Sequence, residues 1–200
     1  MSELIIVEEI GNAAVLRFNR PGIKNPLSIE TLEKLEEFFT SLESNAAIEK
    51  IIFTGSGDTF ASGANLKEIA QLNGETARGF GLRGQNMMQQ IYYSPKITVA
   101  AIDGFCMGGA LDLAMSCKKR IASPRSVFAY PGVGLGIITG WSGTQILPRL
   151  IGEAAALEML LTAKRVDANE ALRINLIDQI AANPLNEALK FTNQKQTPRV

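Results

Sequence analysis

The chain of 200 residues contains no histidine. Without an imidazole, the sequence excludes Ser-His and Cys-His nucleophilic catalysis, HExxH zinc sites and acid–base chemistry by histidine. The two cysteines, Cys106 and Cys117, have a spacing that fits neither a disulfide framework nor a metal site. We therefore expect no metal and two free thiols packed in the core, as in a reducing cytosol. Any catalysis must use carboxylates, lysine, tyrosine or backbone groups.

The sequence also lacks an excess of charge of either sign and any long apolar run. Twenty basic residues balance twenty acidic ones, so we expect no footprint for nucleic acid or for an anionic membrane. No stretch is apolar for long enough to span a bilayer. Residues 1–9 are acidic and have neither the basic region of a signal peptide nor the arginine pattern of a transit peptide. These features predict a cytoplasmic protein with one domain.

Strand-like and helix-like patterns alternate along the chain. Segments 4–9 and 13–18 flank Gly11-Asn12 and predict a β-hairpin. Ser28 has the character of an N-cap, and apolar residues recur after it at helical spacing. Further strands are expected at 51–54, 97–102, 121–122 and 127–130, and further helices near Leu66, at 75–92, from 142 onward, and at 152–162, 167–174 and 184–190. This alternation predicts an α/β fold with mainly parallel strand pairing.

At two places a buried strand ends, glycines follow and a helix begins. The first of these junctions runs from Thr54 to Leu66, and the second from Ile102 to Asp112. The first N–H groups of a helix have no partner inside it and carry the positive end of its dipole. Gly108-Gly109, and Ser62-Gly63-Ala64 in the first junction, would therefore offer backbone donors to an anion or a developing oxyanion. Alternatively, these glycines only permit tight packing of strand against helix.

Asp112 is one turn into the apolar helix that follows the second junction. Because it is flanked by Leu111 and Leu113, it could be a buried acid–base group with a perturbed pKa. It could equally be the structural partner of a basic residue. The candidates for that partner are Lys118, Lys119, Arg120 and Arg149.

Five segments in order resemble the signature blocks of the crotonase, or enoyl-CoA hydratase/isomerase, superfamily. These segments are FNRPGIKNPLS (18–28), FASGANLKEI (60–69), AAIDGFCMGGALDLAMSCKKRIAS (100–123), GLGIITGWSGTQILPRLIG (134–152) and LLTAKRVDANEALRINLID (160–178). The similarity runs over about residues 3–183. It implies a single-domain spiral of ββα turns over residues 1–183, followed by a short C-terminal helix and tail over 184–200.

The resemblance also implies a ligand and a set of site residues. The ligand is an acyl-CoA thioester, with coenzyme A as part of the substrate and no prosthetic group. The family's oxyanion hole carries over to the backbone N–H groups of Ala64 and Gly109. Its CoA-binding stretch carries over to Ala64, Asn65, Leu66 and Lys67, and Lys24 matches a region beside the nucleotide end. Family members assemble as homo-oligomers, usually trimers or dimers of trimers.

The sequence departs from the family pattern at the acids. Hydratases of the family place two carboxylates around one water; the first carries over to Asp112, and the second falls on Gly132. A further acidic position of some relatives falls on Gly140. Asp112 would then move protons alone or with help from Glu68, Tyr130 or Lys67, for which surface or packing roles stay open.

Two further features of this chain concern the pocket around that acid. Trp141 would shape the acyl pocket or simply pack in the core. The C-terminal helices that relatives carry are expected to be shortened in this chain. Three explanations stay open: the pocket is more open, a neighbouring subunit covers it, or the chain is a truncated form.

The sequence therefore predicts an enzyme that stabilises a thioester enolate and either hydrates or isomerises an enoyl-CoA. Two alternatives stay open at this point. One is a non-catalytic protein that binds acyl-CoA, and the other is a decarboxylase of a malonyl-type thioester.

Overall fold

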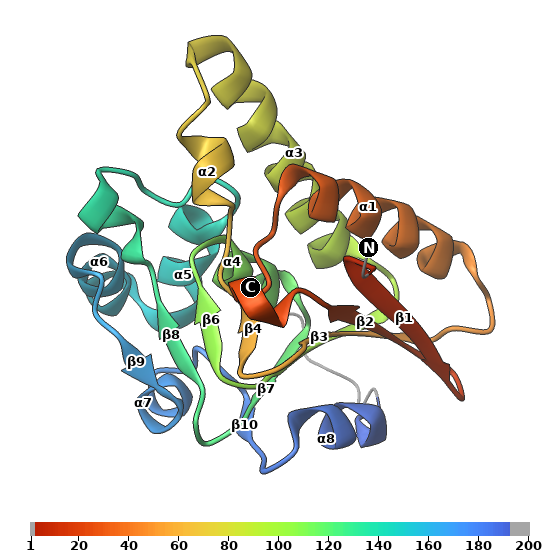
Figure 1. The fold of residues 1–200 in the computed structure, drawn as a ribbon. Helices are drawn as coiled ribbons and strands as arrows, with labels where there is room; N and C mark the ends of the chain where they lie inside the picture. Colours follow the sequence, from red (N-terminus) through yellow and green to blue (C-terminus); the bar gives the residue numbers. More distant parts are fainter. Residues whose placement is uncertain (1–2, 193–200) are drawn as a thin grey trace.

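A six-stranded sheet lies between α8 (Pro184–Lys190) and the other helices in a computed structural model that describes residues 3–192 (Figure 1). Its strand order is β1-β2-β3-β5-β7-β10. Only the hairpin of β1 and β2 is antiparallel, and the other neighbours pair in parallel. The predicted hairpin and the mainly parallel pairing are thus confirmed. The strands are β1 (Ile5–Ile10), β2 (Ala13–Phe18), β3 (Lys50–Gly55), β5 (Ile97–Ile102), β7 (Lys119–Ala122) and β10 (Gln179–Ile180).

A second sheet of short strands stands beside the first. Its order is β4-β6-β8-β9, with β4, β6 and β8 in parallel and β9 antiparallel to β8. The strands are β4 (Thr59–Ala61), β6 (Phe105–Met107), β8 (Val127–Ala129) and β9 (Val166–Asp167). The sequence pattern predicted a glycine-rich connection with no strand between Thr54 and Leu66, so β4 corrects that prediction. A strand of three residues is too short to show a period, and only pairing with its neighbours defines it.

The helices complete a repeated unit of two strands and a helix. The chain passes from β3 to β4 to α2 and α3, then from β5 to β6 to α4, then from β7 to β8 to α5. This order is the ββα spiral that the resemblance implies. The helices are α1 (Ile29–Ser44), α2 (Leu66–Ile69), α3 (Gly74–Tyr93), α4 (Gly109–Ser116), α5 (Gly143–Ile151), α6 (Glu153–Thr162), α7 (Ala168–Arg173) and α8 (Pro184–Lys190), with 3₁₀ turns at Pro21–Ile23 and Pro131–Leu135.

Local chemistry explains the best-predicted helices. The Ser28 side chain accepts a hydrogen bond from the Thr31 N–H at 3.1 Å, which confirms it as the N-cap of α1. The three glycines within the first half of α3 do not break it. Its second half buries Met87, Met88 and Ile91 in the core, so tertiary packing outweighs low helix propensity.

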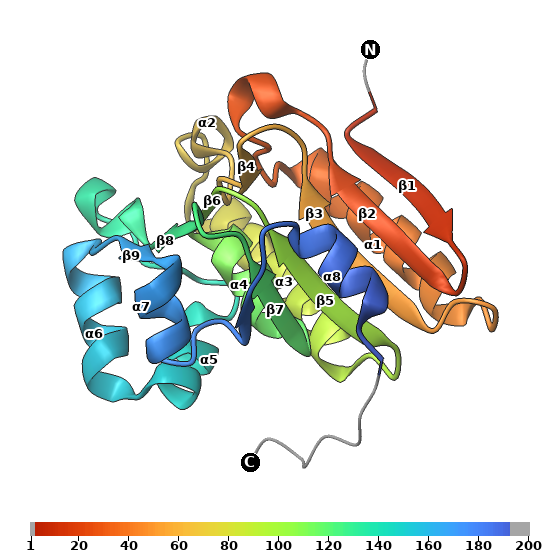
Figure 2. The same cartoon turned by 90° about the horizontal axis from the view of Figure 1, so that it is seen from below.

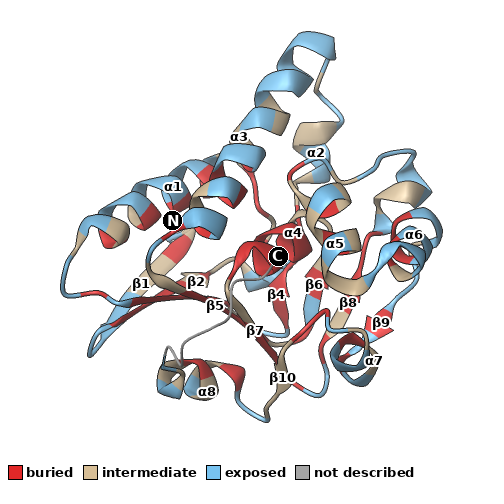
Figure 3. Ribbon diagram, turned by 180° about the vertical axis from the view of Figure 1, so that it is seen from behind, coloured by how far each residue is buried: buried red, intermediate tan, exposed pale blue. Residues whose placement is uncertain are grey.

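The two faces of the large sheet are covered very differently. On one face, α4 is buried almost completely under the other helices (Figure 3). On the other face, α8 packs across β3, β5 and β7 (Figure 2). Lys50 anchors α8, because its Nζ donates to the carbonyls of Ala188 at 3.0 Å and Leu189 at 2.7 Å. The predicted last helix is therefore confirmed, whereas residues 193–200 of the expected tail lie outside the described residues. None of the helices described could cross a membrane.

Candidate active site

The two strand-to-helix junctions meet at one place. Parallel pairing of β4 with β6 sets them side by side, and a bridge between Leu27 and Ala64 holds the first from the other side. A Cβ atom on Gly63 would lie 2.9 Å from the nitrogen of Gly109 and 2.6 Å from the carbonyl oxygen of Met107. Gly63 also has a φ of +86°. Glycine is required here because the two backbones are in direct contact.

A cavity of about 210 Å³ opens where the junctions meet. Ala64 and Gly109 line it together, although they are 45 positions apart in the sequence. Among residues 3–192, no charged side chain is part of its wall. The lining residues are Ser62, Ala64, Leu66, Ile69, Phe80, Gly108, Gly109, Tyr130, Pro131, Gly132, Val133, Leu135, Ile137, Ile138, Thr139, Gly140, Trp141 and Leu160. Such a wall suits an apolar group and strengthens any hydrogen bond made inside it.

The backbone N–H groups of Ala64 and Gly109 make no hydrogen bond to another group within the described residues. Gly109 is the first residue of α4, where a helical N–H has no partner inside the helix. The preceding Gly108 has a φ of +54°, and its N–H donates to the carbonyl of Ala129 at 3.0 Å. The cavity wall thus carries two unused backbone donors.

Asp112 is fully buried directly behind this wall and does not itself line the cavity. The Tyr130 hydroxyl donates to Oδ1 at 2.7 Å, and the Thr139 hydroxyl donates to Oδ2. The backbone N–H of Ser142 also donates to Oδ2, at 3.2 Å. Both hydroxyl groups belong to residues of the cavity wall. The Tyr130 and Thr139 hydroxyl groups therefore lie between the Asp112 carboxylate and the cavity.

Burial raises the pKa of the Asp112 carboxyl above its ordinary value, although hydrogen bonds from Thr139 and Tyr130 oppose the shift. The pKa of the Tyr130 phenol is raised well above its usual range by burial, with the Asp112 charge adding to the effect. Tyr130 accordingly stays protonated at neutral pH, and its hydroxyl can donate to the carboxylate.

The second interpretation of Asp112, as the partner of a basic residue, is wrong. Its hydrogen-bond partners in the structure are hydroxyl and backbone N–H groups. The four basic candidates are engaged elsewhere: Lys118 Nζ donates to the Lys96 carbonyl at 2.7 Å, Arg120 pairs with Asp178 at 2.8 Å, Lys119 Nζ lies 5.4 Å from the centre of the Phe191 ring, and Arg149 donates to the Gln145 carbonyl.

Sequence reasoning missed Thr139 and Ser142 as partners of the acid. They are 27 and 30 positions away from Asp112 in a loop without a periodic pattern. Tyr130 was one of several candidate helpers, and the structure brings it into contact with Asp112. Hydroxyl residues near a glycine-rich loop are too common to single out without the fold.

The chain is similar in sequence to known enzymes. The family model described as enoyl-CoA hydratase/isomerase matches residues 8–194. The chain belongs to the enoyl-CoA hydratase/isomerase family. It is 36% identical over 193 residues to the short-chain-enoyl-CoA hydratase of Clostridium acetobutylicum, covering 95% of this chain and 74% of that protein. It is 41% identical over 179 residues to the crotonyl-CoA hydratase of Syntrophomonas wolfei, covering 89% and 69% respectively.

A solved structure supports the same fold. The enoyl-CoA hydratase from Bacillus anthracis superimposes with a TM-score of 0.89 at 32% identity, over 94% of this chain and 74% of that one. The crotonase-type spiral expected from the resemblance is therefore confirmed.

Within this family fold, the two positions that lack the expected acids both face the cavity. Gly132 and Gly140 are part of its wall and carry no side chain. Asp112 lies behind this wall, where it accepts hydrogen bonds from the Tyr130 and Thr139 hydroxyl groups. Within residues 3–192, no group of three or more histidine, cysteine or acidic side chains could hold a metal ion.

Of the residues expected to hold coenzyme A beyond Ala64 and Gly109, the structure brings only Leu66 to the cavity wall. Asn65 is the N-cap of α2, and its side chain accepts from the Lys67 N–H at 3.0 Å. Lys67 itself is exposed.

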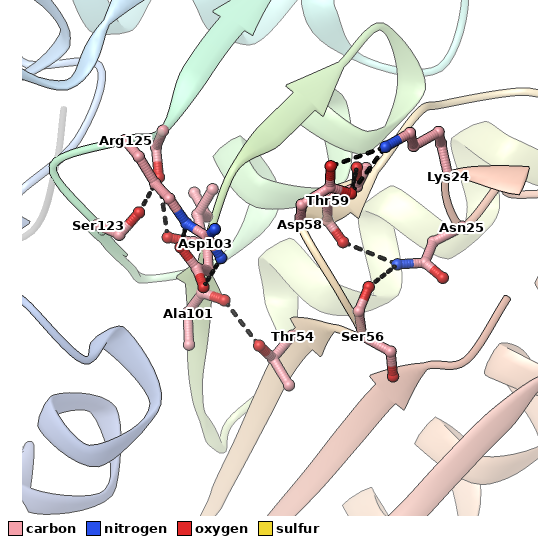
Figure 4. A network of polar contacts seen from close by, with 12 residues as sticks. Lys24, Asn25, Thr54, Ser56, Asp58, Thr59, Ala101, Asp103, Ser123 and Arg125 are labelled. Carbon is pink, nitrogen blue, oxygen red and sulfur yellow. Dashed lines mark hydrogen bonds and ion pairs between the residues drawn. The ribbon is translucent and has the colours of Figure 1, made fainter. Parts of the chain in front are cut away.

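Lys24 lies outside the cavity wall, in a polar network at the surface. Its Nζ is 2.8 Å from both carboxylate oxygens of Asp58 (Figure 4). Beside this pair, the Asn25 side-chain amide donates to the carbonyls of Ser56 at 2.9 Å and Thr59 at 2.7 Å. The network fixes the loop that leads into the first junction.

The other candidate helper, Glu68, has a structural contact. Its Oε2 accepts from the Ile29 N–H at 2.9 Å, at the start of α1. Trp141 does line the cavity, as expected of a residue that shapes a pocket, and it is also packed in the core.

Proposed function

We propose that the chain is an enzyme that acts on an enoyl-CoA by stabilising a thioester enolate. The N–H groups of Ala64 and Gly109 would donate to the thioester oxygen and form the oxyanion hole. The observation that carries this proposal is the convergence of two unused backbone donors on one cavity without charged side chains. Preorganised donors in such a site are worth about 3–4 kcal/mol each in transition-state stabilisation.

The proton would move through Tyr130 to Asp112. With a 3-enoyl-CoA, the carbon next to the thioester carbonyl loses its proton to the Tyr130 oxygen as the Tyr130 proton passes to Asp112 Oδ1 along the 2.7 Å hydrogen bond. The electron pair of the broken C–H bond becomes the enolate, Tyr130 stays neutral, and Asp112 becomes a neutral acid. Burial favours that neutral form, because it raises the pKa of Asp112.

A single acid supports double-bond migration most directly. Tyr130 would then give a proton to the other end of the enolate and take back the proton held by Asp112, so both groups regain their starting state. Migration in a 2-enoyl-CoA such as crotonyl-CoA runs through the same steps in reverse. Exchange of these O–H protons with the solvent brings deuterium into the product in deuterated buffer.

Hydration with the same groups would take two steps, since glycine stands at both further acid positions. Water would add to the β-carbon while its proton passes through Tyr130 to Asp112, and the neutral Asp112 would then return a proton through Tyr130 to the α-carbon of the enolate. The names of the relatives favour hydration, so both reactions belong to the proposal.

Coenzyme A would extend from the cavity past Leu66 toward Lys67 and Lys24, as the family resemblance implies. We also propose that the chain forms a homo-oligomer, a trimer or a dimer of trimers, in the cytoplasm. Exposed leucines on α6 support an interface, because Leu157 and Leu161 are 55% and 59% exposed and lie one turn apart.

Proton NMR of crotonyl-CoA in deuterated buffer, with and without the protein, tests the proposed reaction. Formation of 3-hydroxybutyryl-CoA would establish hydration, and a shifted double bond carrying deuterium would establish isomerisation. Neither change at high protein concentration, combined with retained binding of crotonyl-CoA, would indicate a non-catalytic binding protein instead. Turnover of a malonyl-type thioester alone would indicate a decarboxylase.

A further inference from the structure

Trp141 separates the catalytic cavity from a second hollow. The second cavity, of about 590 Å³, lies between α3 and α5. Met88 and Ile146 give it an apolar side, and Arg149 lies on its rim. The only residues that line both cavities are Gly140 and Trp141, within the described part of the chain. Since Gly140 has no side chain, the indole is the partition between them.

The indole occupies a slot that two glycines create. A Cβ atom on Gly84 of α3 or on Gly109 of α4 would overlap the Trp141 ring. The centre of the Phe80 ring lies 5.6 Å from the centre of the Trp141 ring. Trp141 is 5% exposed. One edge of the indole therefore lies against Gly109, whose N–H is a proposed oxyanion donor.

The loop that carries Trp141 is fastened on both sides. The Gln85 side-chain amide donates to the Gly140 carbonyl at 2.7 Å. Asp112 accepts hydrogen bonds from Thr139 and from the Ser142 N–H. These bonds hold the residues before and after the indole, so the partition is a fixed wall.

We propose that Trp141 sets the upper limit on the length of the acyl chain. This inference rests on the proposed function, because it assumes that an acyl-CoA enters the catalytic cavity. The volume of that cavity is below the about 300–1,000 Å³ of pockets that enclose a drug-sized ligand. A short acyl group fits in front of the indole, and a longer chain meets it. Removal of the indole joins the two cavities and lets the extra methylenes extend along the side of the second cavity that Met88 and Ile146 form.

The test is calorimetric binding of free CoA and of butyryl-, hexanoyl-, octanoyl- and decanoyl-CoA to wild type and Trp141→Ala. We expect wild-type affinity to stop rising after the shorter chains. We expect the affinity of decanoyl-CoA for Trp141→Ala to be at least about tenfold higher than its affinity for wild type, because a few newly buried methylenes suffice for that gain. Trp141→Phe is the matched control and should keep the short-chain profile. Trp141→Leu is the second variant, since it removes less packing if the alanine protein does not fold.

Two results would overturn the proposal. One is a wild type whose affinity rises steadily to decanoyl-CoA, and the other is a folded Trp141→Ala or Trp141→Leu protein with an unchanged profile. Failure of the assumption that an acyl-CoA enters the catalytic cavity looks different, because wild type would then bind no acyl-CoA more tightly than free CoA. Failure of the proposed reaction alone would appear in the NMR test with crotonyl-CoA and would leave this binding profile unchanged.

Discussion

The two strand-to-helix junctions share a plan but differ in what surrounds their acids. In both, the helix that follows carries one acid, and that acid accepts a hydrogen bond at the start of another helix. Glu68 accepts from the Ile29 N–H of α1 at 2.9 Å, and Asp112 accepts from the Ser142 N–H, just before α5, at 3.2 Å. Glu68 is half-buried, whereas Asp112 is fully buried behind two hydroxyl groups of the cavity wall. The same local architecture therefore yields a structural cap in one case and a candidate proton carrier in the other.

The junctions also need glycine for different reasons. Gly63 has a positive φ and faces the backbone of Met107, which cannot move away. Gly109 has no such backbone constraint, and what fills the space beside it is the Trp141 side chain. The first junction is thus shaped by backbone against backbone, and the second by backbone against one removable ring.

The largest expected effect separates the two acids. Asp112→Asn should lower turnover by about 10²–10⁴-fold, because the proton has no other acceptor, while binding of acyl-CoA is kept. Glu68→Gln is the matched variant at the first junction. It should keep turnover near wild type and at most cost about 1 kcal/mol of stability through the weakened cap of α1. NMR assays with crotonyl-CoA and urea unfolding of the same samples measure both effects.

Tyr130→Phe sharpens this comparison, because it removes the proposed proton path and leaves the carboxylate in place. Turnover should fall as well. Turnover by Asp112→Asn equal to wild type would contradict the assignment of Asp112. An equal loss in Glu68→Gln and Asp112→Asn would show that both acids act only through the fold.

The next largest effect is a difference in the stability that alanine costs at Gly63 and at Gly109. Gly63→Ala should cost about 3 kcal/mol or more, since it adds left-handed backbone strain to a clash with backbone. Gly109→Ala should cost about 1–3 kcal/mol through overpacking against Trp141. Urea unfolding should show that the cost of Gly109→Ala disappears in a Trp141→Ala background. The cost of Gly63→Ala should be the same in both backgrounds.

In each double-mutant cycle, the glycine variant in the Trp141→Ala background is compared with Trp141→Ala itself. The stability lost with the indole therefore cancels. A coupling of zero between Gly109 and Trp141 would contradict the contact that defines the second junction. An equal coupling for Gly63 would mean that the two junctions respond as one packed unit.

The smallest effect is a difference in pH dependence. The pKa of Asp112 is raised by burial, so the native state holds its proton at pH values where the unfolded chain has lost it. Its contribution to stability is therefore full below its ordinary pKa and is lost as pH rises through the native value. The pKa of Asp58, in the first junction, is lowered by the hydrogen bond from Lys24. Its contribution to stability has the opposite pH dependence, because it is present above the ordinary pKa and is lost as pH falls through the native value.

Urea midpoints measured from pH 4 to 8 check this difference. Relative to wild type, Asp112→Asn should gain stability toward high pH, and Asp58→Asn should lose less stability toward low pH. The second change should be the smaller one, because the Lys24–Asp58 pair is exposed to solvent. Parallel pH profiles for wild type and Asp112→Asn would contradict the raised pKa.

Much of the fold could be predicted from local pattern. The α1 helix has a capping serine and a sustained apolar stripe, and β5 has a run of β-branched residues between Pro95 and Gly104. Such signals span a whole element, so they are found where they were predicted. The short strands β4 and β6 give no comparable signal, and they are the elements that set the two junctions side by side.

The candidate site divides in the same way. Glycine before an apolar helix, and an acid within that helix, already indicated backbone donors near Asp112, because a helix N-terminus is defined by local sequence. The burial of Asp112, its contacts with Tyr130 and Thr139, and the wedge of Trp141 between Gly84 and Gly109 were decided by the tertiary structure alone. These contacts join segments that lie 18 to 57 positions apart in the sequence, and only packing around the shared core selects them.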